Sequence, residues 1–405
     1  MRLWAICGAL AAGEYLASFA PEFAPMWPVP AIGAALVALF GFGLRLKGWG
    51  YAFAMLFGIA IFLFVSRGDA QRYLESPWMR GRDWRYRQRQ EQQVGAAKAV
   101  KDDFSRRVGI GLDDDRETVS LSRAILLGER RRLPSRTKRL FVESGTMHVF
   151  AISGLHVMAI AQVLTVGLGL FLIPIRFAGL LSIPLLWGYV MVIGGAPSAV
   201  RAAMMATIMG IAPVFWRRAN GLRAWELTFL LVHVCDPLLI ANVGNALSFA
   251  VMLAIVVVGD FAKSMPKWRQ ALLVTLAAWA ASVPISAHVF GRVTPGGMVA
   301  NLVLIATAKA TVVAGALGVG VSYLSRTVAA HLNNFTALGI RGMVLVAEAV
   351  SRLPGANFET TPWSILTCVE WYAVLALIGF LMSRAAARRR AYNCRQRSYG
   401  GDPCS

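Results

Sequence analysis

Long apolar runs separated by short basic loops are the dominant pattern of this sequence. A helix needs about 20 mainly apolar residues to cross the hydrocarbon core of a bilayer. Runs of that order occur three times before residue 66 and repeatedly between residues 143 and 383. The pattern predicts an all-α polytopic integral membrane protein with about 11 (about 10 to 12) transmembrane helices, some of them broken at a central site. Residues 336–353 are amphipathic, and the pattern leaves open whether they cross, re-enter or lie flat.

The same pattern divides the chain into four parts. We expect a three-helix membrane segment at 1–66, a polar helical segment at 67–142, a second membrane domain at 143–383 and a basic tail at 384–405. Basic loops lie on the cytoplasmic side of a membrane protein. The loop around Arg45 and the tail are therefore predicted to be cytoplasmic, and so are both termini.

The polar segment carries 19 Lys and Arg residues against 11 Asp and Glu residues between positions 67 and 139. Long segments cross a membrane largely regardless of charge, so we expect it outside the cytoplasm. Residues 84–108 contain no proline and many helix formers, which predicts a helix. Aromatic and basic side chains interleave at its start: Trp78, Arg80, Arg82, Trp84, Arg85, Tyr86 and Arg87. That mixture suits single-stranded nucleic acid or a helix lying on lipid headgroups, and the lipid interpretation is favoured.

Two breaks in the apolar sequence between residues 143 and 201 give the strongest functional signal. Ser153-Gly154 interrupts a run of membrane length, and His156 follows three residues after the serine. Residues 194–198 (GGAPS) interrupt the next run, and Arg201 follows Ser198 at the same offset. Ionisable side chains at membrane depth are functional-site candidates, and helix starts favour anions. Ordinary helix caps, with Arg201 reaching the nearer interface, are the structural alternative.

Polar residues also begin two later runs. In the predicted topology, four helix starts face an anion that arrives from outside. The candidate substrate path is Ser153, Gly154, His156, Ser198, Arg201, Asn245 and Asn301.

The amino-acid composition excludes one class of protein and agrees with the apolar pattern. The chain is 57% hydrophobic and only 15% charged, whereas soluble domains carry about 25% charged residues, so a soluble core is excluded. Its formal charge of +20 fits an anionic partner or many basic loops at an anionic membrane face. The five cysteines form no disulfide framework.

Several catalytic motifs are absent from the sequence. It contains no G-x-x-x-x-G-K-[ST], no His-x-His pair and no H-E-x-x-H. We therefore expect no nucleotide hydrolysis, no metal site, no cofactor and no enzymatic activity. A hydroxyl three residues before a histidine, as in Ser153 and His156, is more often a capping pattern than a nucleophile and its base.

Four stretches together resemble the membrane domain of the ComEC competence-protein family, the inner-membrane channel for DNA uptake in natural transformation. They are LLGERRRLPSRTKRLFVESGTMHVFAISGLHV at 126–157, GAPSAVRAAMM at 195–205, DPLLIANVGNALSFAVMLAI at 236–255 and, more weakly, GGMVANLVLI at 296–305. Members of that family typically carry an OB-like domain and a metallo-β-lactamase-like nuclease domain. Neither is expected here, because the segment after the third run is short and helical and the chain ends soon after its last apolar run.

The resemblance implies that 143–383 is a channel domain that passes single-stranded DNA across the bacterial inner membrane into the cytoplasm. It implies that the partners are the lipid bilayer, a separate DNA receptor, a nuclease and a cytoplasmic ATPase or helicase; the oligomeric state stays open. A secondary transporter of a small anionic or phosphorylated solute is the first alternative, and an intramembrane hydrolase using Ser153 and His156 is a weaker one. An occluded cavity near Lys309 would favour the transporter, and a carboxylate or metal-ligand set near His156 would favour the hydrolase.

Overall fold

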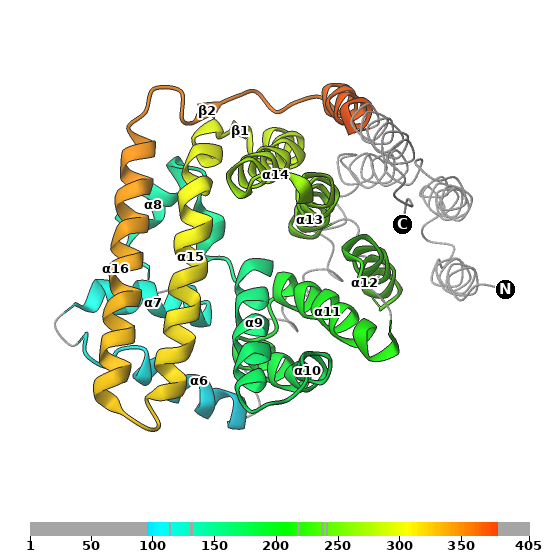
Figure 1. The fold of residues 1–405 in the computed structure, drawn as a ribbon. Helices are drawn as coiled ribbons and strands as arrows, with labels where there is room; N and C mark the ends of the chain where they lie inside the picture. Colours follow the sequence, from blue (N-terminus) through cyan, green and yellow to red (C-terminus); the bar gives the residue numbers. More distant parts are fainter. Residues whose placement is uncertain are drawn as a thin grey trace, which may run out of the picture. The chain divides into compact units, whose positions relative to one another are not determined.

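The computed structural model describes residues 95–112, 115–129, 133–216, 219–235, 239 and 242–379 (Figure 1). The three predicted membrane runs before residue 66, the interleaved aromatic and basic residues at 78–87 and the tail at 384–405 lie outside these ranges. The chain divides into two compact units. The larger unit comprises Leu74–Val232 and Arg292–Thr360, and the smaller unit comprises Met1–Tyr73, His233–Gly291 and Thr361–Ser405.

The described residues are mainly helical, as the apolar pattern predicts. The larger unit contains α6 (Gly95–Arg107), α7 (Arg116–Leu127), α8 (Ser135–Glu143), η3 (Met147–Phe150), α9 (Gly154–Leu170), α10 (Ile175–Val192), α11 (Pro197–Ile211), η4 (Ala212–Phe215), α15 (Pro295–Val321) and α16 (Arg326–Ser351). A short antiparallel pair, β1 (Arg292–Val293) and β2 (Phe358–Glu359), closes it. Helix α12 (Gly221–Cys235) runs across the boundary between the two units.

Four helical stretches are long and apolar enough to cross a membrane: Pro197–Phe215, Val243–Ser264, Lys267–Phe290 and Pro295–Val321. Shorter apolar helices cover Gly154–Leu170, Phe177–Val192 and Ile365–Gly379. These helices lie where the apolar runs predict them. The total of about 11 spans stays a prediction, because the first three runs lie outside the described residues and three of the described apolar helices are shorter than a span needs.

Helices α15 and α16 pack side by side as a long hairpin in the larger unit (Figure 1). Glycine allows the two helices to approach closely, because a Cβ at Gly339 would collide with the Thr311 hydroxyl. Helix α16 is amphipathic, as predicted, but it begins at Arg326, ten residues before the expected start. The capping side chain of Ser325, which accepts from the Val328 N–H, explains the earlier start.

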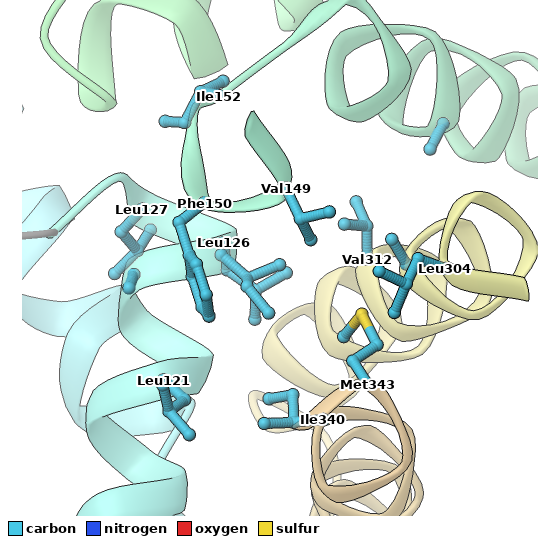
Figure 2. Packing of buried hydrophobic residues seen from close by; sticks show 14 of the residues in the cluster. Leu121, Leu126, Leu127, Val149, Phe150, Ile152, Leu304, Val312, Ile340 and Met343 are labelled. Atoms are coloured by element: carbon cyan, nitrogen blue, oxygen red, sulfur yellow. The ribbon is translucent and has the colours of Figure 1, made fainter. Parts of the chain in front are cut away.

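The core of the larger unit lies where α7 and η3 meet this hairpin (Figure 2). Figure 2 labels Leu121, Leu126, Leu127, Val149, Phe150, Ile152, Leu304, Val312, Ile340 and Met343. The rings of Phe141 and Phe150 pack edge to face with centroids 4.6 Å apart. The part of the polar segment that contains α7 and α8 therefore contributes to the same hydrophobic core as α9 and α15.

Residues 95–145 contact both ends of α15. The Arg107 guanidinium donates to the Ser322 hydroxyl at 3.1 Å, just beyond the last residue of α15. Gly145 lies against Thr294 and Gly297 at its first residues. A helix of 27 residues is about 40 Å long, which exceeds the bilayer core of about 30 Å. Described residues before Thr146 therefore lie against both ends of α15, and the expected position of the polar segment outside the cytoplasm stays a prediction.

The smaller unit packs α13 (Val243–Phe261) against α14 (Lys267–Phe290). Pro284 lies inside α14 and has no N–H, so the carbonyl of Ala280 loses its intrahelical donor. The Trp371 indole of helix Ile365–Gly379 donates to that carbonyl at 2.9 Å, and the Tyr372 hydroxyl donates to the next one, Ala281. A side chain from a neighbouring helix thus satisfies the backbone group that the proline releases.

Candidate functional site at the starts of α9 and α11

The first break produces the start of α9 in the predicted place. Ser153 is the N-cap with extended backbone, and Gly154 is the first helical residue. His156 is buried, with 1% of its surface exposed. Its Nδ1 atom accepts from the Ser153 backbone N–H at 3.3 Å and lies 3.1 Å from the Ser153 hydroxyl. Nδ1 acts as an acceptor here, so a neutral ring carries its proton on Nε2 and presents a donor there.

The second break produces the start of α11, but Ser198 does not cap it. Gly194 and Gly195 have φ values of 84° and 64°, which end the preceding helix turn as the Gly-Gly sequence predicts. Ala196 is the N-cap and Pro197 the first helical residue, so Ser198 already lies inside the helix. Ser198 therefore does not take the capping position that Ser153 has in α9, although the two serines have the same offset to Arg201 and His156. Its hydroxyl donates instead to the carbonyl of Ile152 at 2.5 Å.

This hydrogen bond brings the two breaks together. Ile152 immediately precedes the α9 N-cap, so Ser198 fixes the start of α11 beside the start of α9. Ile152 is 2% exposed and packs against the end of α7, where a Cβ at Gly128 would lie 2.7 Å from its Cδ1 atom. The two sequence motifs therefore form one structural site on a rigid core.

Arg201 lies one turn inside α11 and is 6% exposed. Its neighbours in the helix are small: Ala199, Ala202 and Ala203 are all buried. A guanidinium stays charged under all ordinary conditions, and its burial is costly unless an anion or several acceptors face it. This burial differs from the exposed position of a side chain that extends to the nearer interface, and the role of Arg201 in the substrate path stays a prediction.

Asn301 lies on the first turns of α15 and belongs to the same unit. It lies beside His148, a residue of η3 that the sequence patterns did not single out. The His148 side chain is exposed, and it also lies against the Gly145 backbone. The sequence feature that could have identified His148 is its position shortly before the break at Ser153.

Asn245 has a different setting from the other predicted site residues. It lies in α13 of the smaller unit, and its Nδ2 atom donates to the Leu239 carbonyl at 2.9 Å. The same atom lies 3.0 Å from His233 Nε2, while its backbone N–H is capped by Asn242. These contacts fix the start of α13. Within the residues that the structure describes, no group of three His, Cys, Asp or Glu side chains could hold a metal ion.

Comparison with known proteins identifies the family. The family model described as "Competence protein" matches residues 125–385. The chain is 28% identical over 216 residues to ComE operon protein 3 of Bacillus subtilis, covering 52% of this chain and 27% of that protein. It is 30% identical over 200 residues to an uncharacterized protein of Aquifex aeolicus, covering 48% of this chain and 43% of that one.

A third relative, the uncharacterized protein YcaI of Escherichia coli, is 30% identical over 139 residues, covering 32% of this chain and 18% of that protein. The chain spans less than half the length of each of these relatives. No solved structure matches the chain significantly. Because the family match covers well over half of its residues, the chain belongs to the competence protein family.

Proposed function

We propose that this protein is an inner-membrane channel that passes single-stranded DNA into the cytoplasm during natural transformation. The observation that carries the proposal is the hydrogen bond from Ser198 to the Ile152 carbonyl, which joins two helix starts in a chain of the competence family. These starts hold the buried His156 and Arg201 side chains. Together they form the electropositive collar: Ser153, Gly154, His156, Ser198 and Arg201; Asn301 belongs to the same unit.

The chemistry of the collar suits a phosphodiester. Arg201 offers a permanent charge and a planar fork of donors, which match phosphate oxygens. A helix N-terminus disfavours a charged imidazole, so His156 acts as a neutral donor through Nε2. One fixed charge and several neutral donors attract a phosphate without holding it too tightly, and a translocating chain must leave each site it enters.

Transport of a small phosphorylated solute through the same collar is the nearest alternative, because phosphate recognition would be similar. We favour DNA because the family match covers the collar. An intramembrane hydrolase is the least favoured function, because Nδ1 of His156 already accepts a hydrogen bond from the backbone N–H of Ser153. A base whose lone pair is shared with a backbone donor removes a hydroxyl proton poorly.

The remaining components are proposed to be separate proteins. The sequence contains no P-loop, so a cytoplasmic ATPase or helicase would pull the strand, while a receptor and a nuclease would deliver it. In that arrangement the channel lowers the barrier for the charged strand and does no work itself. The bilayer surrounds it.

A deletion strain tests the function. Duplex DNA labelled along its length is offered to wild-type and deletion cells, and surface-bound label is separated from label that resists external nuclease. We expect the deletion to abolish the protected label while surface binding is retained. Normal protected label, or loss of both fractions together, would contradict the channel. Uptake of radiolabelled phosphate esters that depends on this protein, with normal DNA uptake, would favour the solute transporter.

A further inference from the structure

A second basic site lies at the far end of the α15–α16 hairpin from Gly145. A cleft of about 550 Å³ opens there between α6, α7 and the start of α16. Its lining residues are Arg106, Gly109, Ile110, Gly111, Leu112, Arg116, Val119, Ser120, Arg123 and Arg326. We name this the arginine cleft. Four of these side chains are arginines, and none of the lining residues that the structure describes is acidic.

The walls of the arginine cleft are fixed. Asn333 of α16 is buried and donates from Nδ2 to the carbonyls of Arg107 and Ile110, both at 2.9 Å. Gly111 has a φ of 79°, and a Cβ there would lie 2.6 Å from the Ala330 Cβ. The Arg123 Nε atom donates to the Ser105 carbonyl at 3.0 Å, which ties α7 to α6. A side chain other than glycine at position 111 would push this wall away from α16.

Two described carboxylates beside the cleft have partners of their own, and only one of them pairs with a lining arginine. Asp103 accepts from Arg107 Nε at 2.6 Å and from the Tyr323 hydroxyl at 2.7 Å, and its other oxygen accepts from the lining residue Arg106 at 3.2 Å. Asp115 caps α7 and pairs with Arg341 at 2.7 Å. Among the described residues, no hydrogen bond or ion pair involves the side chains of Arg116 or Arg326. These two arginines also occupy the first positions of α7 and α16, where the helix dipole adds to their positive potential.

The position of the cleft identifies the kind of anion. Arg326 lies five residues beyond the end of α15, whose 27 residues are long and apolar enough to cross a membrane. Tyr323 and Leu324 between them are 57% and 90% exposed, as expected for a helix end at a membrane interface. The cleft contains Ile110, Leu112 and Val119 beside its arginines, but its described lining has no aromatic ring on which a nucleobase could stack.

We propose that the arginine cleft binds the phosphate headgroup of an anionic phospholipid. Basic pockets beside membrane helices bind such headgroups, with the apolar wall covering the glycerol and the first acyl carbons. The site is independent of the proposed DNA path, because it uses none of the collar residues. Its role is to hold α6 and α7 at a defined depth in the membrane.

The test uses the full-length protein purified in a neutral detergent and titrated with phosphatidylglycerol or phosphatidylcholine, with bound lipid counted by native mass spectrometry. Wild-type protein should prefer phosphatidylglycerol. At about fivefold per basic residue near an anionic lipid, the double variant Arg116→Ala/Arg326→Ala should lose about 25-fold of that preference. Arg116→Lys/Arg326→Lys should keep most of it, because the charge remains.

The matched control is Arg136→Ala/Arg139→Ala, which removes the same charge from two exposed positions on α8. The control should keep the wild-type preference; an equal loss in both double variants, or no loss in either, would overturn the proposal. Two further titrations identify the source of the phosphate. Stronger arginine-dependent binding of inorganic phosphate, or of a 20-nucleotide single-stranded DNA, would overturn the lipid assignment in favour of that ligand.

Discussion

Positive charge has different surroundings in the collar and at the Tyr323 end of the α15–α16 hairpin. In the collar, Arg201 is 6% exposed, and the Ser198 hydroxyl is hydrogen-bonded to the carbonyl of the buried Ile152. At the end near Tyr323, many charged groups lie at the surface, where Arg106 is exposed and Arg107 stacks 3.5 Å from the Tyr323 ring centre. A buried charge interacts strongly with each neighbour, whereas solvent screens exposed pairs. Single substitutions should therefore have large effects in the collar and small effects at the Tyr323 end of the hairpin.

The interface position of the arginine cleft first requires that the two ends of α15 lie on opposite sides of the membrane. Glu143 and Thr327 are exposed and mark the two ends. In a cysteine-free background, Glu143→Cys and Thr327→Cys should differ completely: an impermeant maleimide should label one in intact cells and the other only after permeabilisation. Labelling of both from the same side would show that α15 does not cross, and the arginine cleft would lose its argument from the membrane interface.

The largest functional effect is expected at Arg201. Arg201→Ala removes the fixed charge of the collar. In the proposed channel this charge pairs with a DNA phosphate, and the loss of one partner of a buried charge pair weakens binding by about 100-fold or more. Protected DNA should fall by that factor while surface binding, expression and membrane insertion are kept. Arg201→Lys should retain part of the activity, because it keeps the charge but not the fork of donors.

The control for Arg201 is Arg352→Ala at the surface. Arg352 pairs with Glu348 but its side chain is 75% exposed, so its loss should leave DNA uptake unchanged. Normal uptake by Arg201→Ala would show that the buried guanidinium serves packing alone. Equal losses in both variants would show that uptake follows total charge rather than this site.

The second-largest effect is expected at the joint between the two helix starts, the hydrogen bond from Ser198 to the Ile152 carbonyl. Ser198→Ala leaves the Ile152 carbonyl without its donor, and an unsatisfied buried acceptor costs about 1–3 kcal/mol. The apparent unfolding temperature in detergent should fall, and DNA uptake should fall by about tenfold. Ser198→Thr restores the hydroxyl and should recover both. If Ser198→Ala lowers neither quantity, the joint does not hold the collar together.

Local sequence patterns predicted the elements of this site well. The breaks at Ser153-Gly154 and Gly194-Gly195 follow from capping and from backbone freedom, which are properties of adjacent residues. The burial of His156 and Arg201 followed from their position in apolar sequence. Such features depend on the few residues around them, so a single sequence contains them.

Contacts between distant segments were not predictable in the same way. Ser198 binds a backbone carbonyl 46 residues earlier, and every residue has a carbonyl, so no pattern marks Ile152 as the partner. The arginine cleft joins Arg116 to Arg326, and each alone resembles an ordinary solvated charge. The core role of α7 could have been found, since Leu121, Ala124 and Ile125 follow helical spacing. The high charge of the predicted polar segment at 67–142 drew attention away from this apolar spacing in α7.

The third-largest effect is expected at His156, where two substitutions separate the contribution of hydrogen bonding from that of packing. His156→Gln keeps a donor in the first turn of α9, whereas His156→Leu keeps volume but removes every polar group. Uptake should be reduced less by His156→Gln than by His156→Leu, with a difference of about fivefold, the value of one hydrogen bond of about 1 kcal/mol. Equal uptake in the two variants would remove His156 from the substrate path and leave it a structural role beside Ser153.

The smallest effect belongs to the exposed end, at Asp103. Hydrogen bonds from Arg107 and then from Tyr323 lower the pKa of Asp103 from 3.8 to about 2. A carboxyl whose pKa is lower in the folded state stabilises the fold above its unfolded pKa and loses that contribution as the pH falls toward the folded value. The contribution of Asp103 is therefore present at pH 7 and is lost between about pH 4 and pH 2. Because solvent screens this surface pair, Asp103→Asn should lower the unfolding temperature at pH 7 by less than Ser198→Ala does. The difference between Asp103→Asn and wild type should shrink as the pH is lowered from 4 toward 2, which thermal unfolding of the purified protein in detergent can follow. A loss at pH 7 larger than that of Ser198→Ala would reverse the contrast between the collar and the exposed Tyr323 end of the hairpin.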